Sequence, residues 1–360
     1  MVFQINYHTH ELEGVFQLHN AAIHSIALNE AFCVTGSSDN ILRVWPLDFS
    51  EFFLEAKHEG TVTAIDITQD GIQVICGTEI GSIGLLDIAQ QNYKTLLRSH
   101  TKGIRSLELH TNRNNLLTLS EDNTIRIWDL ETYDEVYEFC SFEDKPLCLA
   151  AHPSLPLFAC GFQSGTLRIF DIQRTTVVEE YRQFDKPLVK LKYAPNEGLL
   201  VCVAQDGYVC IHNAGKAHQP IKTVEVDVAV PFPALQFSFD QAIFLTVGSA
   251  GSSVNIWDSR VLATKAVVGI GAAIVKDLKF LNVNHDFVVL LHDNMIKFFT
   301  IQGNLLRKFN PGADLNTLTV SNNAMYLAAS GNDAIVRIFD AQFPSNTEPD
   351  MQVNVLFNKI

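Results

Sequence analysis

Short apolar runs recur along the chain at a nearly constant interval. Eight such runs each end in one aromatic or apolar residue, or in a histidine at the same place, and these end positions are Trp45, Leu86, Trp128, Phe170, His212, Trp257, Phe299 and Phe339. Successive end positions lie 40 to 45 residues apart. Between them lie two further short apolar runs per repeat, each bounded by turn residues. This period is typical of four-stranded propeller blades, so the pattern predicts an all-β propeller.

Two other positions recur in register with the end positions. Six residues before the end position, five repeats carry an aspartate within a turn-forming sequence, at Asp39, Asp122, Asp206, Asp293 and Asp333. Two residues before it, five repeats carry a cation, at Arg43, Arg126, Arg168, Lys297 and Arg337. Aspartate and the Asn or Gly that follows it favour tight turns, and strand alternation puts the cation and the end residue on one face. Each repeat therefore predicts a turn followed by its last strand.

The number of repeats predicts eight blades, with seven as the alternative. Because each repeat supplies an outer strand before its three inner strands, we expect Val15–His19 to complete the last blade and close the ring. The C-terminal sequence MQVNVLFNKI also reads as an outer strand and competes for that place. The predicted organisation is a leader over residues 1–14, a propeller over 15–341 and a tail over 342–360.

In its repeat end positions, turn aspartates and recurring cations, the chain resembles the WD-repeat family of β-propellers over nearly its whole length. In that family a His, a strand Ser or Thr, a turn Asp and a Trp form a hydrogen-bonded tetrad in each blade. The resemblance assigns two tetrads, which are His100, Thr118, Asp122 and Trp128 in the third repeat and His19, Thr35, Asp39 and Trp45 in the first. A buried indole N–H and imidazole need such partners. Other repeats depart from the motif, with Ile80 and Leu86 in the second and His212 in the fifth.

Composition limits the classes of partner. Hydrophobic residues make up 47% of the 360 residues and charged residues 18%, which supplies a large core and excludes global disorder. Forty acidic residues against 26 Lys and Arg give a net charge of −14. That balance disfavours nucleic acid and anionic membrane as partners, since both require a basic surface.

The cysteines and the start of the chain bear on the compartment. The seven cysteines form no C-x-x-C pair and mostly sit among apolar neighbours, as reduced core cysteines do. The first residues, MVFQINYHTHELEG, do not read as a signal peptide, and no apolar run approaches the length of a membrane span. We expect a soluble protein of a reducing compartment.

Motifs for catalysis are missing from the sequence. It contains no G-x-S-x-G nucleophile elbow and no P-loop, and GIGAAI at 269–274 has only part of a dinucleotide fingerprint. His8 and His10 lack the accompanying ligands of a metal site. The prediction is a protein that is not an enzyme and that uses no cofactor, metal or small-molecule substrate.

What remains is surface for protein partners. Aromatic candidates lie in the connection after the first repeat and in the proline-containing stretch VAVPFPALQF of the sixth. Basic candidates lie around the starts of the third and fifth repeats. The candidate contacts are Phe52, Phe53, Phe232, Lys94, Arg98, Lys102, Arg105, Arg182, Lys186 and Lys190.

One stretch is more specific than the repeats. Residues 32–60, FCVTGSSDNILRVWPLDFSEFFLEAKHEG, resemble the centriolar WD repeat-containing protein 90 family, as do SHTKGIRSL at 99–107, LSEDNTIRIWDL at 119–130 and HPSLPLFACGFQSGTLRIF at 152–170. The resemblance implies one propeller of a longer chain and a scaffold of the centriole or basal-body microtubule wall that supports cilium assembly. It implies a cytoplasmic, cytoskeletal location at the centriole, basal body or cilium. Its implied partners are other centriolar or axonemal proteins and tubulin.

Two other binding functions fit a propeller of this kind. One is a different microtubule-associated propeller, of the echinoderm microtubule-associated-protein-like or doublet inner-junction type. The other is a peptide-reading adaptor, such as a substrate receptor of a ubiquitin ligase, which needs a basic or aromatic ring at the mouth of the channel.

Overall fold

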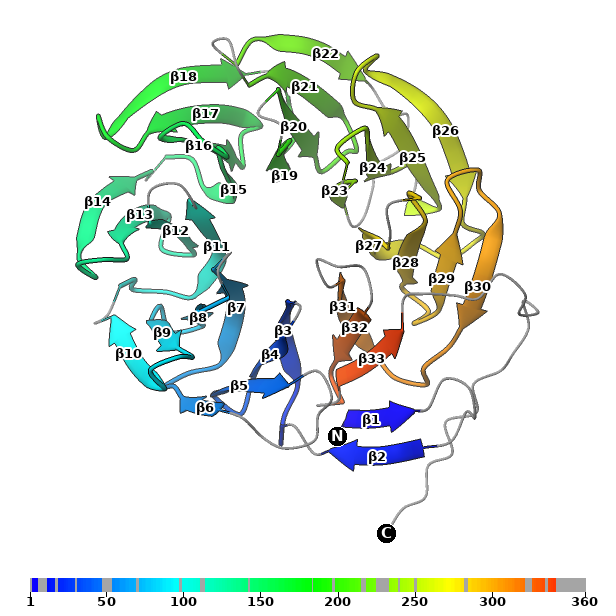
Figure 1. Cartoon of the computed structure of the whole chain (residues 1–360). Coiled ribbons are helices and arrows are strands. Elements are labelled where there is room, and N and C mark those ends of the chain that lie inside the picture. Colours follow the sequence, from blue (N-terminus) through cyan, green and yellow to red (C-terminus); the bar gives the residue numbers. More distant parts are fainter. Residues whose placement is uncertain are drawn as a thin grey trace.

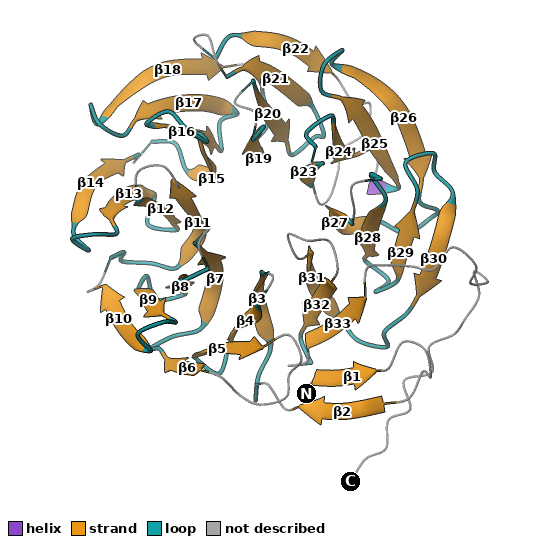
Figure 2. Ribbon diagram, in the orientation of Figure 1, coloured by secondary structure: helices purple, strands orange, loops and turns teal. Residues whose placement is uncertain are grey.

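The computed structural model shows eight β-sheets arranged radially around a centre (Figure 1). It describes residues 2–5, 12–16, 19–29, 31–46, 54–68, 71–96, 99–110, 114–141, 143–182, 184–195, 198–214, 218–224, 233–238, 240–248, 251–281, 284–320, 326–333 and 336–340. Within these ranges the regular structure is β-strand, joined by turns and one short helical turn (Figure 2).

Seven of the sheets have four strands each, consecutive in the chain. The first blade is β3 (Ile23–Leu28), β4 (Phe32–Ser37), β5 (Ile41–Pro46) and β6 (Leu54–Lys57). The second is β7 (Val62–Ile67), β8 (Gln73–Thr78), β9 (Ile83–Asp87) and β10 (Asn92–Leu96). The third is β11 (Ile104–His110), β12 (Asn115–Ser120), β13 (Thr124–Asp129) and β14 (Glu135–Cys140). The fourth is β15 (Pro146–Ala151), β16 (Leu157–Phe162), β17 (Thr166–Asp171) and β18 (Thr176–Arg182).

The remaining blades continue the order around the ring. The fifth is β19 (Leu188–Tyr193), β20 (Leu199–Ala204), β21 (Val209–Asn213) and β22 (Pro220–Val224). The sixth is β23 (Leu235–Phe237), β24 (Ile243–Val247), β25 (Ser253–Asp258) and β26 (Ala263–Gly269). The seventh is β27 (Val275–Phe280), β28 (Phe287–Leu291), β29 (Ile296–Phe299) and β30 (Leu305–Phe309). The eighth holds β31 (Leu315–Val320), β32 (Tyr326–Gly331) and β33 (Val336–Asp340), with β1 (Val2–Ile5) and β2 (Leu12–Phe16).

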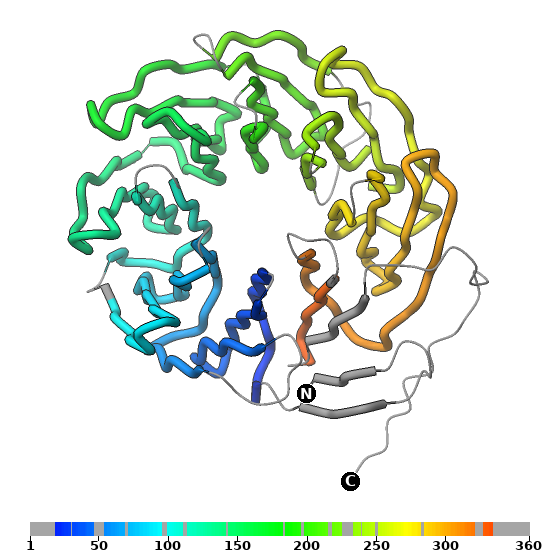
Figure 3. Tube along the Cα trace, viewed as in Figure 1, coloured from blue at the N-terminus to red at the C-terminus, as the bar shows by residue number. Residues whose placement is uncertain are grey.

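The prediction of an eight-bladed propeller is confirmed. Each of the first seven blades begins with its innermost strand and ends with its outermost one, and the trace then returns to the centre for the next blade (Figure 3). The first and last blades meet, because β3 packs against β31 and β32.

The strand that extends the last blade differs from our expectation. We expected Val15–His19 beside β33, but β1 lies there, parallel to β33, with Phe3 opposite Arg337. Strand β2, which contains Val15, pairs antiparallel with β1 and is the outermost strand of this sheet. Residues Val2–Ile5 thus belong to the last sheet, although the sequence pattern assigned residues 1–14 to a leader. The tail over 342–360 lies outside the described residues, and the boundary at residue 341 stays a prediction.

Burial follows the position of a strand within its blade. Middle strands are covered on both faces by the neighbouring blades, so β20 is buried at every residue and reads LLVCVA. Outer strands face solvent, and β18, TVVEEYR, is exposed or half-buried throughout. A strand buried on both faces requires a continuous apolar run, whereas an outer strand tolerates charge. Six of the seven cysteines are buried free thiols, and Cys140 on β14 is exposed.

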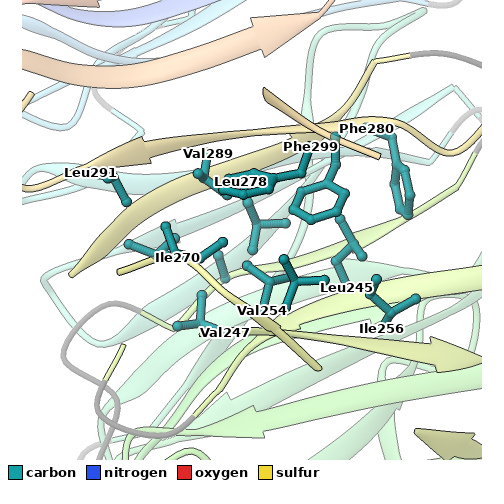
Figure 4. Close-up of a cluster of buried hydrophobic side chains, with 14 of the residues drawn as sticks. Leu245, Val247, Val254, Ile256, Ile270, Leu278, Phe280, Val289, Leu291 and Phe299 are labelled. Atoms are coloured by element: carbon teal, nitrogen blue, oxygen red, sulfur yellow. The ribbon is translucent and has the colours of Figure 1, made fainter. Parts of the chain in front are cut away.

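A large hydrophobic core lies between the sixth and seventh blades. Leu245 and Ile256 of the sixth pack against Leu278, Phe280 and Phe299 of the seventh (Figure 4). All five side chains are 4% exposed or less. Removing this much apolar surface from water is the main force that holds neighbouring blades together.

The turns between second and third strands explain the recurring aspartates. Asn40, Asn123 and Asn294 follow an aspartate there and have φ of 65°, 67° and 63°. Gly165 takes the same place in the fourth blade with φ 84°. Asparagine and glycine tolerate this left-handed conformation best, so the repeats place one of them at the same point in blade after blade.

Candidate interaction surfaces and blade networks

The third blade contains a continuous chain of hydrogen bonds. Trp128 on β13 donates from Nε1 to Thr118 Oγ1 on β12 at 3.1 Å, and Thr118 Oγ1 lies 2.8 Å from Nε2 of His100. The other ring nitrogen, Nδ1, lies 3.1 Å from Oδ2 of Asp122. With Nδ1 protonated, His100 donates to Asp122 and accepts from the Thr118 hydroxyl. The structure therefore brings together the four residues that the resemblance assigned to this tetrad.

Burial and hydrogen bonds determine the protonation states of His100 and Asp122. Burial is the largest influence on His100 and lowers its pKa, so the imidazole is neutral near pH 7. Burial alone would raise the pKa of Asp122, but hydrogen bonds from Thr124 and from the Thr101 N–H outweigh it and lower that pKa to about 2. His100 and Thr118 are 4% and 0% exposed, so this row of carboxylate, imidazole and hydroxyl lies inside the blade.

The first blade shows the same arrangement around His19. Its Nε2 lies 2.7 Å from Thr35 Oγ1, and its Nδ1 lies 2.9 Å from Oδ2 of Asp39. Arg43 adds an ion pair to Asp39 at 3.2 Å. Burial lowers the pKa of His19 to about 4. Trp45 is buried nearby on β5, with 5% of its surface exposed.

The second blade has a different network at the equivalent place. His58 occupies the histidine position, but Cys76 replaces the threonine, and Cys76 Sγ lies 3.3 Å from Nε2 of His58. The partner of Nδ1 is the hydroxyl of Tyr93 on the outer strand β10, at 2.6 Å. Gly84 stands where Arg126 stands in the third blade, and a Cβ there would meet the Tyr93 hydroxyl and His58. The absence of a side chain at Gly84 is what admits Tyr93.

Sequence reasoning missed two further networks. In the sixth blade Trp257 donates to Thr246 Oγ1 at 2.8 Å, and Thr246 is fully buried. In the fifth blade His212 takes the tryptophan position, and its Nδ1 lies 2.6 Å from the carbonyl oxygen of His218. The hydroxyl of Tyr193 lies 2.9 Å from Nε2 of His218. Thr246 was discoverable from the sequence, because it stands eleven residues before Trp257 in a strand-like run.

The recurring arginines bind within their own blades. Arg43, Arg126 and Arg168 on the third strands reach Glu55, Glu138 and Glu180, their partners on the outer strands, at 3.0, 2.6 and 2.8 Å. Opposite charges directly across two strands stabilise the pairing of the strands. These arginines therefore tie the third strand to the outer strand.

The predicted contact residues fall into two groups. Phe52, Phe53, Phe232 and Arg98 lie outside the described residues, so their role stays a prediction. Around the third repeat, Lys94 lies on the outer strand β10, with Nζ 4.4 Å from the centre of the Tyr133 ring.

The remaining cations near the third repeat are nearer the ring centre. Lys102 is exposed in the turn before β11. Arg105 lies on β11, the innermost strand of that blade, and contacts Glu121 at 3.1 Å. Lys94 and Arg105 are thus on the outermost and innermost strands of neighbouring blades.

The cations near the fifth repeat are similarly spread out. Arg182 ends the outer strand β18 and contacts Glu180 at 3.2 Å, and Lys186 is exposed in the connection to the next blade. Lys190 lies on β19, the innermost strand of the fifth blade. They are neighbours in sequence because the connection runs from an outermost strand to an innermost strand, so Arg182 and Lys190 lie on different strands at opposite ends of their blades.

The innermost strands carry charges of both signs at one equivalent position. By strand register this position is Ala27, Asp66, Glu108, Ala150, Lys192, Gln236, Lys279 and Thr319 in successive blades. Burial, then the nearby Asp66 carboxylate, raises the pKa of Glu108 to about 7. Burial, then the nearby Lys279 ammonium, lowers the pKa of Lys192 to about 8. A position with two acids and two lysines differs from the uniformly basic ring that a reader of acidic peptides needs.

Among the described residues, no group of three or more His, Cys, Asp or Glu side chains is placed to hold a metal ion. In the described part, no helix is long and apolar enough to cross a membrane.

Comparison with known proteins gives the chain a family. The model described as WDR90/POC16, second beta-propeller, matches residues 108–356, and the model for the WD domain, G-beta repeat, matches residues 10–46. The first of these covers more than half of the chain. The chain belongs to the WDR90/POC16 family. The resemblance to this family and to WD-repeat proteins, drawn from the sequence, is thereby confirmed.

Several relatives carry WDR90/POC16 names. WD repeat-containing protein 90 of Xenopus tropicalis is 46% identical over 144 residues, and that of Homo sapiens is 45% identical over 144 residues. Each alignment covers 40% of this chain and 8% of the relative. Centriole proteome protein 16 of Chlamydomonas reinhardtii is 44% identical over 99 residues, which is 28% of this chain and 5% of that protein. The chain therefore matches a small part of much longer relatives.

A solved structure supports the fold alone. The crystal structure of the computationally designed Ika8 protein superposes with a TM-score of 0.76, over 89% of this chain and 97% of that one. The two are 19% identical in sequence, so the likeness concerns architecture.

Proposed function

We propose that this chain is a non-catalytic scaffold module of the centriole, contributing a rigid protein-binding disc to the microtubule wall. The observation that carries the proposal is the family match over residues 108–356, together with 44% identity to a protein named for the centriole proteome. A propeller presents loops and outer edges around a stiff core and is suited to hold several partners at fixed geometry.

The described networks also fit a structural role. The histidines of the first and third blades are buried, neutral and saturated by partners in their own blade. Three of the four arginines that recur in sequence, Arg43, Arg126 and Arg168, are paired with outer-strand glutamates. These histidines and arginines stabilise the blades from within, so we infer that partners are recognised by other side chains on the surface.

Direct contact with tubulin is the finer part of the proposal. A net charge of −14 repels an acidic microtubule surface at long range. Screening limits that repulsion to about 8 Å at physiological salt, so a local contact remains compatible with the overall charge. We propose that the disc meets wall proteins, or tubulin in one fixed geometry, and thereby supports cilium assembly.

The test is localisation of the tagged 360-residue chain in ciliated cells. We expect enrichment at centrioles and basal bodies, and the same tag on an unrelated propeller serves as control. A folded chain that stays diffuse through the cytoplasm would overturn the proposal.

Co-sedimentation with polymerised microtubules, at low and physiological salt, separates the two kinds of partner. Saturable binding at physiological salt makes tubulin a direct partner, whereas binding lost with salt assigns the contact to other wall proteins. A microtubule-associated propeller of another type would bind microtubules without centriolar enrichment. A peptide adaptor would show neither.

A further inference from the structure

We propose that the outer edge of the fifth and sixth blades binds an acidic, extended segment of a partner protein. The surface consists of the outer strands β22 and β26 and the turn before β26, residues 259–262, and we call it the basic rim. The two strands follow one another along the outside of the ring (Figure 1). The inference rests on the proposed function, because it names the chemistry of a partner that the scaffold would hold.

The basic rim lies in two stretches of the chain that contain no acidic residue. Residues 207–224, which include β22, and residues 259–276, which include β26, have no Asp or Glu, although the whole chain has 40. The outer strands of the third and fourth blades differ, since β14 and β18 each contain two glutamates. The formal charge of the outer strands therefore changes sign between the fourth and fifth blades.

Three cations gather where the two strands of the basic rim meet. Nζ of Lys222 on β22 donates to the carbonyl oxygen of Leu262 at 2.6 Å, which brings the edge of the fifth blade to the turn of the sixth. A carbonyl oxygen orients this ammonium group without neutralising its charge. Arg260 in the turn and Lys265 on β26 are exposed, and among the described residues neither makes an ion pair within 4 Å.

Asp258 is the acid that stands next to these cations in the sequence. Its carboxylate accepts hydrogen bonds from the backbone N–H groups of Arg260 and Val261, at 2.9 and 3.0 Å, and so closes the turn. Those N–H groups lower the pKa of Asp258, and the charges of Lys265 and Arg260 lower it further. One carboxylate against three cations leaves this corner of the molecule positively charged.

Exposed apolar side chains lie among the cations. Val261 is 72% exposed and Val267 is 61% exposed, the highest fractions of any large hydrophobic side chain in the described part of the chain. Strand alternation puts Lys265 and Val267 on the same face of β26. By register, Val267 takes the place that Glu138 has on the outer strand of the third blade. An apolar surface of this kind gains from being covered.

These features together fit an extended acidic segment of a protein. Among the described residues β26 pairs only with β25, so its outer edge can accept a further strand. A strand added there with a carboxylate beside Lys265 can place an apolar side chain beside Val267, two positions away on the same face. Nucleic acid would neutralise the cations but has no strand to pair with the edge. Charge complementarity on a chain of net charge −14 thus singles out this surface for an acidic partner.

The test is fluorescence anisotropy of a labelled peptide rich in Glu and Val, titrated with the 360-residue chain at physiological salt. We expect saturable binding, and the same peptide with Gln in place of Glu should bind about tenfold more weakly or worse. R260E/K265E should weaken binding of the Glu peptide by about tenfold or more, because like charges then meet. K102E/K186E changes two exposed lysines in other connections, is the matched control, and should bind as the parent chain does.

A second variant separates the apolar contact from the charge. Val267→Ser leaves the charge unchanged and should weaken binding by a smaller factor, about threefold, because less apolar surface is covered. All of these changes are at exposed positions, so an unchanged midpoint of thermal unfolding is expected for each variant and shows that a loss of binding is not a loss of fold.

Several results would overturn the proposal. Equal binding of the Glu and Gln peptides would do so, as would equal binding by the parent chain and R260E/K265E. Single-stranded RNA that binds more tightly than the Glu peptide and is released in R260E/K265E would assign the surface to nucleic acid. Self-association of the parent chain in sedimentation velocity that R260E/K265E abolishes would make a second copy the occupant. Centriolar localisation of the tagged chain is a separate readout, so the proposed function can stand when this inference fails.

Discussion

The second and third blades solve the same packing problem with different chemistry. Both place a buried histidine at the start of the blade, His58 and His100, and both give each ring nitrogen a partner. In the third blade the partners are a threonine and an aspartate, and a tryptophan completes the chain. In the second they are Cys76 and Tyr93.

The difference shows what a buried histidine requires. Both ring nitrogens need a partner, because an unpaired buried polar group is costly. Different residues can serve as hydrogen-bond partners of the histidine, provided that they fit the space around its ring. Tyr93 reaches His58 because Gly84 leaves open the volume that Arg126 fills in the third blade. A blade that lacks the family motif is therefore still held by a specific network.

The largest loss of stability is expected when the row of hydrogen bonds in the third blade is broken at Thr118. Thr118→Ala removes the acceptor of Trp128 and the donor to His100, leaving two buried groups without partners. We expect a loss of about 3 kcal/mol in the free energy of unfolding, measured by urea denaturation. Thr118→Ser keeps the hydroxyl and should retain most of the stability. In the second blade Cys76→Ala should cost clearly less, because sulfur is a weak partner and Tyr93 remains. Equal losses for Thr118→Ala and Cys76→Ala would contradict the comparison.

A smaller loss is expected when the space for Tyr93 is filled. In Gly84→Ala the added Cβ would meet the Tyr93 hydroxyl and lie 2.5 Å from His58 Cε1 and 2.9 Å from Cys76 Sγ. Overpacking of this kind costs about 1–3 kcal/mol, read from the midpoint of urea unfolding. Gly269→Ala is the control, since a Cβ there has no atom within 4 Å. A neutral Gly84→Ala would show that Tyr93 does not occupy this space.

Removing only the Tyr93 hydroxyl isolates the bond to His58. We expect Tyr93→Phe to lower the free energy of unfolding by about 1 kcal/mol, because Nδ1 of the buried imidazole loses its partner. Tyr137→Phe on the exposed face of β14 should leave stability unchanged. If both changes were neutral, the second blade would not depend on its histidine network.

A further effect is a pH dependence that comes from the innermost strands. The pKa of Glu108 is about 7 in the folded chain, above its ordinary value of 4.5, so the folded state keeps a proton that the unfolded state has lost. Stability contributed by this group is present below pH 4.5 and is lost as pH rises towards 7. Glu108→Gln should therefore be more stable than the parent at pH 8 and equal to it near pH 4. Thermal unfolding at several pH values measures this, and a constant difference across pH would refute it.

The sequence predicted the repeat, the eight blades, the third-blade tetrad and the His19, Thr35 and Asp39 part of the first, because these depend on residue types at fixed spacing. It could not predict the network of the second blade, since Tyr93 comes from an outer strand that the repeat motif does not specify. The two signals that could have found it are Cys76 at the threonine position and Gly84 at the cation position.

The sequence could not predict which N-terminal strand pairs with β33, for a different reason. The segments Val2–Ile5 and Leu12–Phe16 both read as short strands, and a local pattern identifies a strand without naming its partner. The basic residues near the third and fifth repeats are neighbours in sequence, but a connection from an outermost to an innermost strand separates some of them by the width of a blade. Lys190 and Arg182 are close in sequence but lie on innermost and outermost strands.

Hydrogen exchange followed by mass spectrometry compares the two blades most directly. If different networks hold equivalent blades, the backbone amides of β8 and β9 should be protected to the same extent as those of β12 and β13. The protection of β8 and β9 should fall selectively in Tyr93→Phe. Rapid exchange of β8 and β9 in the parent chain, with β12 and β13 protected, would show that the second blade is held by apolar packing alone and would contradict the account.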